Sequence, residues 1–232
     1  MMQALGARFF DNGGHEIPLM CGASLNSVER IDTSGMHALT DGTAFTAACD
    51  VDTPLLGPRG ATMTFAPQKG ATAADLLTLE TGMTRIAGIL GKHTSSTGFA
   101  DKAGSGAAGG LGAALCAMLG AELKRGAEIV LDAVHFNELA EKADMVITGE
   151  GRSDLQTLMG KLPYTIMKRA QKHALPAMLI SGAVDNPKAL LDAGFTAVRA
   201  VTPTGQTLEE AMKPDTARMN IKKTVHELWG NL

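Results

Sequence analysis

The chain has 232 residues, 45% of them hydrophobic, and a formal net charge of -3 at pH 7. A chain of this length and composition buries a substantial core, so it is globular rather than disordered. Its 21 Lys and Arg residues form no run, which excludes the basic footprint of a nucleic-acid-binding protein. No apolar stretch reaches the roughly 18 residues of a membrane span and no signal peptide is recognisable. We therefore expect no nucleic-acid or membrane partner, and a cytoplasmic location.

Helix and strand patterns alternate along the chain with Gly-rich junctions, which predicts the α/β class. Residues 1–10 space their apolar side chains as a helix does, yet no capping residue precedes them, so we expect a helix that starts before residue 1. Residues 44–49 and 61–65 predict strands, and residues 72–90 and 109–119 predict helices.

The last third has the clearest pattern. Residues 143–148, 177–181 and 195–201 predict strands, separated by helices over residues 157–173 and 186–193 and followed by a helix that includes residues 209–212. Asn186 and Pro187 have the chemistry of an N-cap and a first helical residue. Such an alternation implies right-handed βαβ units and a parallel sheet. Three strands are few for a sheet buried on both faces, so more chain or a partner should cover its edge.

The segment over residues 147–161, ITGEGRSDLQTLMGK, places Glu150, Arg152, Asp154 and Lys161 after the first of these strands. Open α/β sheets bind ligands at the carboxyl ends of their strands. Phosphoryl transfer needs this mixture, since carboxylates hold magnesium or accept the hydroxyl proton and cations neutralise charge on the phosphoryl oxygens. The alternative is a solvated loop whose charges pair with one another.

The segment over residues 49–71 places Asp50 and Asp52 directly after a predicted strand. The two carboxylates form a metal pair only if the chain turns there, which Pro54 allows; turn formation and capping are the alternative. Gln68 and Lys69 could bind an anionic group, although a lone lysine in a loop is usually just solvated.

The sequence GSGAAGGLGAAL, residues 104–115, is a Gly-rich segment that opens a helix. Backbone amides in such a segment can cradle phosphate, which makes Gly106, Gly109 and Gly110 candidates. The segment does not match the P-loop, which requires G-K-[ST] at its end. Close packing of another backbone against small residues explains the composition equally well.

Taken in their order along the chain, the three segments resemble the type 1 glycerate kinase family, and the similarity runs through nearly the whole chain. The resemblance implies an enzyme that transfers the γ-phosphoryl group of ATP, with Mg2+, to a hydroxyl of glycerate. It implies that residues 1–137 form an inserted α/β domain, incomplete at its start. Residues 138–232 would be the C-terminal half of a split Rossmann- or flavodoxin-like parallel-sheet domain, with the site in the cleft between the domains.

The resemblance also implies roles for the residues named above. Glu150, Arg152, Asp154 and Lys161 are the expected catalytic residues; Gln68, Lys69, Gly106, Gly109 and Gly110 the expected glycerate- or nucleotide-binding residues; and Asp50 and Asp52 the expected metal ligands. The expected partners are glycerate and ATP, and the sequence leaves a homo-oligomer open.

The chain departs from the family pattern in two ways. Ser105 and Ser153 replace residues that are usually apolar. The family's N-terminal third, with an opening strand, a D-S-F-K type segment and a G-G-S-A-T type loop, has no counterpart here. The alternatives to an active kinase are therefore an inactive truncated remnant and a module that binds an organic acid without chemistry.

Overall fold

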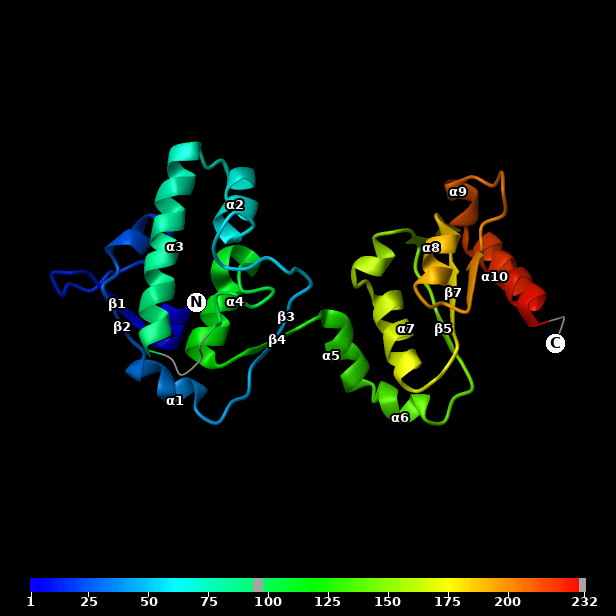
Figure 1. The fold of residues 1–232 in the computed structure, drawn as a ribbon, viewed down its shortest axis with the longest axis horizontal. Helices are drawn as coiled ribbons and strands as arrows, with labels where there is room; N and C mark the ends of the chain where they lie inside the picture. Colours follow the sequence, from blue (N-terminus) through cyan, green and yellow to red (C-terminus); the bar gives the residue numbers. More distant parts are fainter. Residues whose placement is uncertain (94–97, 230–232) are drawn as a thin grey trace. The chain divides into compact units, whose positions relative to one another are not determined.

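The computed structural model of the protein describes residues 1–93 and 98–229 (Figure 1). The chain divides into two compact units, Met1–Gly126 and Ala127–Leu232. This division lies upstream of the predicted domain boundary between residues 137 and 138. Both units combine helices with short strands, and the predicted α/β class is confirmed. No helix in the described ranges is long and apolar enough to cross a membrane.

Unit 1 contains short strands and helices around one long helix. Its elements are η1 (Met2–Leu5), β1 (Arg8–Phe10), η2 (Gly22–Ser27), β2 (Arg30–Asp32), η3 (Ser34–Met36), α1 (His37–Thr40), β3 (Thr46–Ala48), α2 (Ala61–Phe65), η4 (Pro67–Lys69), α3 (Ala73–His93), α4 (Ala107–Leu119) and β4 (Glu122–Lys124). β1 pairs with β2 in antiparallel orientation, and β3 pairs with β4 in parallel orientation.

The long helix α3 organises the core of unit 1 (Figure 1). It packs against η2, α2 and α4, and buried side chains such as Val28, Leu55 and Cys116 fill the space between these elements. Its start is fixed by Asp75, whose Oδ2 accepts hydrogen bonds from the Thr72 amide (2.9 Å) and the Thr72 hydroxyl (2.6 Å). These bonds stabilise the ionised carboxylate and lower the pKa of Asp75.

Two predictions for unit 1 are wrong. Residues 61–65 form the helix α2 rather than a strand, because a short apolar run fits either structure and this one packs against α3 and α4. The predicted helix at the start is only the 3₁₀ helix η1, and β1 follows it. Gly6 ends η1 with φ 100°, and a Cβ there would lie 2.5 Å from the Gly35 carbonyl oxygen. Only glycine accommodates both conditions.

Unit 2 is built around parallel strands. Its elements are α5 (Gly126–Ala133, beginning at the last residue of unit 1), α6 (Phe136–Ala140), β5 (Val146–Thr148), β6 (Arg152–Ser153), η5 (Thr157–Met159), α7 (Leu162–Lys172), β7 (Ala177–Ser181), β8 (Ala183–Val184), α8 (Pro187–Asp192), β9 (Ala197–Ala200), α9 (Leu208–Ala211) and α10 (Pro214–Trp229).

The three predicted strands of unit 2 form the parallel sheet β5-β7-β9, as the βαβ pattern indicated. β6 and β8 form a second parallel pair just beyond the ends of β5 and β7. Met167 and Ala170 of α7 pack with Leu179 of β7 and Leu190 of α8 in a fully buried core. β5 is an edge strand of its sheet, and its Ile147 is 52% exposed.

The helices of unit 2 differ in detail from the prediction. The predicted helix over residues 157–173 breaks at Gly160, which has φ 98°, so that η5 and α7 are separate. The last predicted helix is two helices, α9 and α10, and Pro214 begins the second. Asn186 lies at the N-cap position of α8 but, with φ 52°, makes no side-chain capping bond.

A buried arginine joins α5 to α7 within unit 2. The Arg169 guanidinium pairs with the carboxylates of Glu128 and Asp132, one helical turn apart on α5; the contact with Asp132 is 2.6 Å. The side chain of Arg169 is largely removed from solvent, so truncating it would leave two carboxylates without this cation. The first two turns of α5 are thereby held on unit 2.

Candidate functional site

The loop after β5 is held close to the end of β7 by backbone contacts. The amides of Gly182 and Ala183 donate to the carbonyl oxygens of Glu150 (3.1 Å) and Gly151 (3.0 Å). A Cβ on Gly149 would lie 2.0 Å from the Ile180 carbonyl oxygen, so glycine is required where the two strands approach. The loop is therefore anchored at the carboxyl ends of two parallel strands, the usual ligand-binding edge of such sheets.

Glu150 is fixed in this loop by two hydroxyl groups. The Ser153 hydroxyl donates to Glu150 Oε1 over 3.0 Å, and the Thr157 hydroxyl donates to the same oxygen over 2.6 Å. Ser153 and Thr157 are fully buried, whereas the Glu150 side chain is 19% exposed. One carboxylate oxygen is thus bound inside the loop while the residue still reaches the surface.

Lys161 lies between two of the predicted catalytic carboxylates. Its Nζ is 4.0 Å from Glu150 Oε2 and 4.0 Å from Asp154 Oδ1. Asp154 Oδ1 also accepts a hydrogen bond from the Gln156 amide at 2.8 Å. The Lys161 side chain is 42% exposed, so solvent screens these loose ion pairs and the ammonium group is accessible to a ligand. The structure brings Glu150, Asp154 and Lys161 together.

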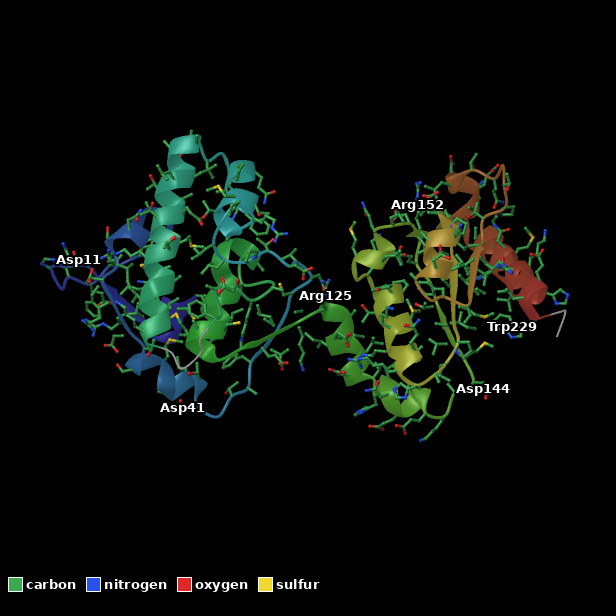
Figure 2. All side chains as sticks on the ribbon, viewed as in Figure 1. Asp11, Asp41, Arg125, Asp144, Arg152 and Trp229 are labelled. Atoms are coloured by element: carbon green, nitrogen blue, oxygen red, sulfur yellow. The ribbon has the colours of Figure 1, made fainter. Side chains whose placement is uncertain are left out.

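Arg152, the fourth predicted catalytic residue, has another partner. Its guanidinium contacts Asp185 Oδ2 through Nε (2.8 Å) and a terminal nitrogen (2.7 Å). Figure 2 labels Arg152, whose side chain is largely exposed. Asp185 and Asp154 line a small polar hollow of about 460 Å³ with Leu155, Gln156 and Asn186. Arg152 therefore balances a carboxylate at the rim of this hollow.

A second hollow of unit 2, of about 730 Å³, lies beside Glu150. Thr148, Gly149 and Glu150 form its polar side at the end of β5. Ile147 of β5 and Trp229, labelled in Figure 2 at the end of α10, contribute to its apolar wall. Among the described residues that line this hollow, Glu150 is the acidic one, so it lies between a polar loop and an apolar surface.

Asp50 and Asp52, the predicted metal ligands, both contact the segment that follows β4. Both oxygens of Asp52 accept hydrogen bonds from Arg125, at 2.9 and 2.8 Å, and Asp50 Oδ1 accepts one from the Gly126 amide at 2.9 Å. Asp50 thereby caps the first residue of α5, which supports the capping alternative. Across residues 1–93 and 98–229, no group of three or more His, Cys, Asp or Glu side chains is placed to hold a metal ion.

The amides of the Gly-rich segment are used within unit 1. Gly106 donates to the Thr53 carbonyl oxygen (2.9 Å), while Gly109 and Gly110 donate to the Gly106 carbonyl oxygen (3.1 and 3.2 Å). A Cβ on Gly106 would lie 2.1 Å from the Pro54 carbonyl oxygen. These contacts support the packing alternative, because none of the three amides points freely at a ligand.

The predicted binding residues of unit 1 come together only in part. Lys69, Gly109 and Gly110 line one largely apolar cavity of about 580 Å³. Gln68 is exposed on η4, beside Lys69 but outside the lining of this cavity. Three of the five predicted binding residues of unit 1 therefore line the same cavity.

Four polar residues of the unit 2 site were not predicted: Ser153, Thr157, Ser181 and Asp185. Thr157 and Ser153 lie within the loop itself, seven and three residues after Glu150. Ser181 is the last residue of β7 and Asp185 follows β8, so each lies at the carboxyl end of a neighbouring strand. The rule that carboxyl ends of adjacent parallel strands meet would have pointed to them.

Comparison with known proteins places the chain in a family. The model of the glycerate kinase family matches residues 1–231. Glycerate kinase of Bacillus subtilis (strain 168) is 44% identical over 214 residues, which are 92% of this chain and 56% of the relative. Glycerate 2-kinase of Escherichia coli (strain K12) is 41% identical over 214 residues, with the same coverage of 92% and 56%.

A solved structure agrees with these relatives. A crystal structure described as glycerate kinase 2 from Salmonella typhimurium LT2 superposes with a TM-score of 0.75 at 39% identity, over 98% of this chain and 61% of that chain. The chain spans about half the length of the curated relatives that it matches. By its sequence and its fold, the chain belongs to the glycerate kinase family.

Proposed function

We propose that the protein acts in ATP-dependent phosphorylation of glycerate, in which a glycerate hydroxyl attacks the γ-phosphoryl group of ATP directly and phosphoglycerate is formed. The observation that carries this proposal is the meeting of Glu150, Asp154 and Lys161 at the carboxyl edge of the parallel sheet. Two carboxylates flank one accessible ammonium group, which is the combination that phosphoryl transfer uses. Membership of the glycerate kinase family supports glycerate as the acceptor.

Contacts suit three residues of this loop to particular roles: Lys161, Glu150 and Arg152. Lys161 supplies positive charge for the oxygens of the transferred phosphoryl group, since its ammonium group is only loosely paired. Glu150 Oε2 accepts the proton of the attacking hydroxyl, because Oε1 already holds two hydrogen bonds. Arg152 neutralises Asp185 and keeps the rim of the site near electrical balance.

Asp154 also suits magnesium. Hard oxygen ligands are those that Mg2+ prefers, and the Asp154 carboxylate lies beside the Lys161 ammonium group while Glu150 serves as the proton acceptor. A bound Mg2+ would neutralise charge on the ATP phosphates. Asp50 and Asp52 fit this role less well, because Gly126 and Arg125 already occupy oxygens of both carboxylates.

The proposal also covers the domain organisation, cellular location and oligomeric state of the protein. Residues 1–137 are assigned to an inserted domain, residues 138–232 to half of a split sheet domain, and the protein to the cytoplasm. We also propose that the protein forms a homo-oligomer. The edge strand β5 exposes Ile147, and a second copy of the chain would cover this side chain.

A coupled assay of ADP formation with D-glycerate, ATP and Mg2+ tests the proposal. We expect glycerate-dependent turnover by the purified chain and a loss of kcat/KM of about 100-fold or more in Lys161→Met. Lys168→Met is the matched control, because Lys168 is an exposed lysine of α7 that contacts Gln171. Equal activity of Lys161→Met would remove that residue from the mechanism.

Absence of turnover in the unmodified chain would contradict the kinase proposal for this chain. Calorimetry then separates the remaining alternatives. Glycerate binding without ATP binding indicates an organic-acid-binding module, and binding of neither indicates an inactive remnant.

A further inference from the structure

A pair of buried serines lies behind the Glu150 carboxylate. Ser153 and Ser181 are both essentially inaccessible to solvent, and their hydroxyl oxygens are 2.6 Å apart. Ser153 belongs to β6 and Ser181 ends β7, so the pair joins two separate stretches of chain. A buried hydroxyl costs free energy unless it is hydrogen-bonded, and the hydrogen bond between the two serines gives each hydroxyl a partner.

The number of hydroxyl protons fixes which group donates each hydrogen bond in this cluster. An ionised carboxylate only accepts hydrogen bonds, so Ser153 and Thr157 both donate their single hydroxyl proton to Glu150 Oε1. The Ser153 proton is then committed, and Ser181 must donate its own proton to the Ser153 oxygen. On the other side, the Asp154 amide donates to the Thr157 hydroxyl oxygen at 3.0 Å. Both chains of hydrogen bonds end on the same carboxylate oxygen.

The consequence is an asymmetric carboxylate. Oε1 receives two hydrogen bonds from buried groups, whereas Oε2 lies 4.0 Å from the accessible Lys161 ammonium group. A glutamate side chain has several rotatable bonds, and two donors on one oxygen restrict them to the conformation that presents the other. Alanine at both serine positions would fill much of the same space without this restriction.

We propose that Ser153 and Ser181 are positioning residues for Glu150, with Ser181 acting through Ser153. The inference rests on the proposed function and deepens it, since it names the groups that hold the proton acceptor in place. Neither serine contacts a reacting atom.

The test uses Ser153→Ala, Ser181→Ala and the double variant in the full chain. The first readout is the ¹³C NMR signal of the Glu150 side-chain carboxyl carbon, assigned by its loss in Glu150→Gln. The second readout is kcat and KM for D-glycerate. Thr196→Val is the matched control, because the Thr196 hydroxyl donates to the Ala177 carbonyl oxygen (3.0 Å) at the opposite end of β7 from Ser181.

We expect each serine variant to move or broaden the Glu150 signal and to lower kcat about tenfold, the value of one hydrogen bond to a charged group, while KM changes less than about twofold. The double variant should match Ser153→Ala in both readouts, because Ser181 acts only through Ser153. Thr196→Val should leave both readouts unchanged. An unmoved Glu150 signal in Ser153→Ala, or losses that add in the double variant, would overturn the proposal.

The two readouts separate this inference from the kinase proposal. A silent wild-type chain refutes the proposed activity, yet the NMR signal still decides whether the serines hold the carboxylate. Turnover in the wild type with an unmoved signal and full activity in Ser153→Ala refutes the positioning role alone.

Discussion

The Gly-rich segment that opens α4 and the loop after β5 both contain several glycines, but their polar groups make different contacts. In unit 1, the amides of Gly106, Gly109 and Gly110 bond to backbone carbonyl groups and no charged side chain lies within the segment 104–112. In unit 2, Gly149 brings two strand ends together, and Glu150 and Lys161 gather above them. Glycines thus allow close approach in both places, while the loop in unit 2 also gathers charged side chains.

The largest effect is expected from Gly149→Ala. The new Cβ would lie 2.0 Å from the Ile180 carbonyl oxygen, and backbone cannot yield as a flexible side chain does. We expect a loss of about 3 kcal/mol or more in the unfolding free energy of unit 2, measured by urea denaturation. Gly151→Ala is the control in the same loop, since a Cβ there meets nothing within 4 Å. Equal stability of the two variants would refute the close-approach argument.

A smaller effect is expected from Gly109→Ala in unit 1. Gly109 has φ 74° and open space around its Cβ position, so alanine should cost about 1 kcal/mol through backbone strain alone. Because its amide already donates to Gly106, we expect the KM for ATP to stay unchanged. A KM raised tenfold in a stably folded variant would instead assign this segment to phosphate binding.

Asp52→Asn should change stability by only about 0.5 kcal/mol or less, because its bond to Arg125 is an exposed ion pair. Added salt should reduce this difference further. Asp50→Asn keeps an oxygen that can accept from the Gly126 amide, so its stability should also be preserved. A rise in the Mg2+ concentration needed for half-maximal turnover in Asp50→Asn would restore the metal-ligand role.

The smallest effect is expected in the stability of the protein at acid pH. It concerns the starts of α3 and α9, where a threonine bonds to a carboxylate three residues later. Hydrogen bonds from Thr72 lower the pKa of Asp75 in unit 1, and bonds from Thr207 lower the pKa of Glu210 in unit 2. A lowered folded-state pKa adds stability above the unfolded-state value, and this contribution disappears as pH falls through the folded value.

Asp75→Asn should therefore flatten the fall in stability below about pH 4, followed by circular dichroism during urea unfolding. The loss of acid-dependent stability should be larger for Asp75 than for Glu210. Asp75 lies at the start of the 21-residue helix α3 of unit 1, whereas Glu210 lies in the four-residue helix α9 of unit 2. An unchanged slope between pH 5 and pH 3, bracketing the ordinary carboxylate pKa at about 4, would contradict this role of Asp75.

The local sequence pattern was sufficient to predict the strands and the parallel sheet of unit 2. Its strands are short apolar runs bounded by glycine and proline, and the crossing helices force a parallel order, so the sheet β5-β7-β9 was predictable. The same local reasoning failed for residues 61–65, where five residues fit a strand and a helix equally and packing against α3 decides.

The meeting of candidate side chains was predictable where the residues are close in sequence. Glu150, Asp154 and Lys161 lie within one loop, so motif reasoning brought them together. The bond between Ser153 and Ser181 spans 28 residues and depends on the register of β6 and β8, which no local pattern contains. The pairing of Arg152 with Asp185 escaped prediction for the same reason.

The chain passes from one unit to the other through a very short stretch. β4 ends at Lys124 and α5 begins at Gly126, so Arg125, labelled in Figure 2, is the one residue between them. Its side chain is tied to Asp52, and the turns of α5 that follow are clamped by Arg169. The ion pair is partly exposed, so added salt should weaken the hold of Asp52 on the side chain of Arg125.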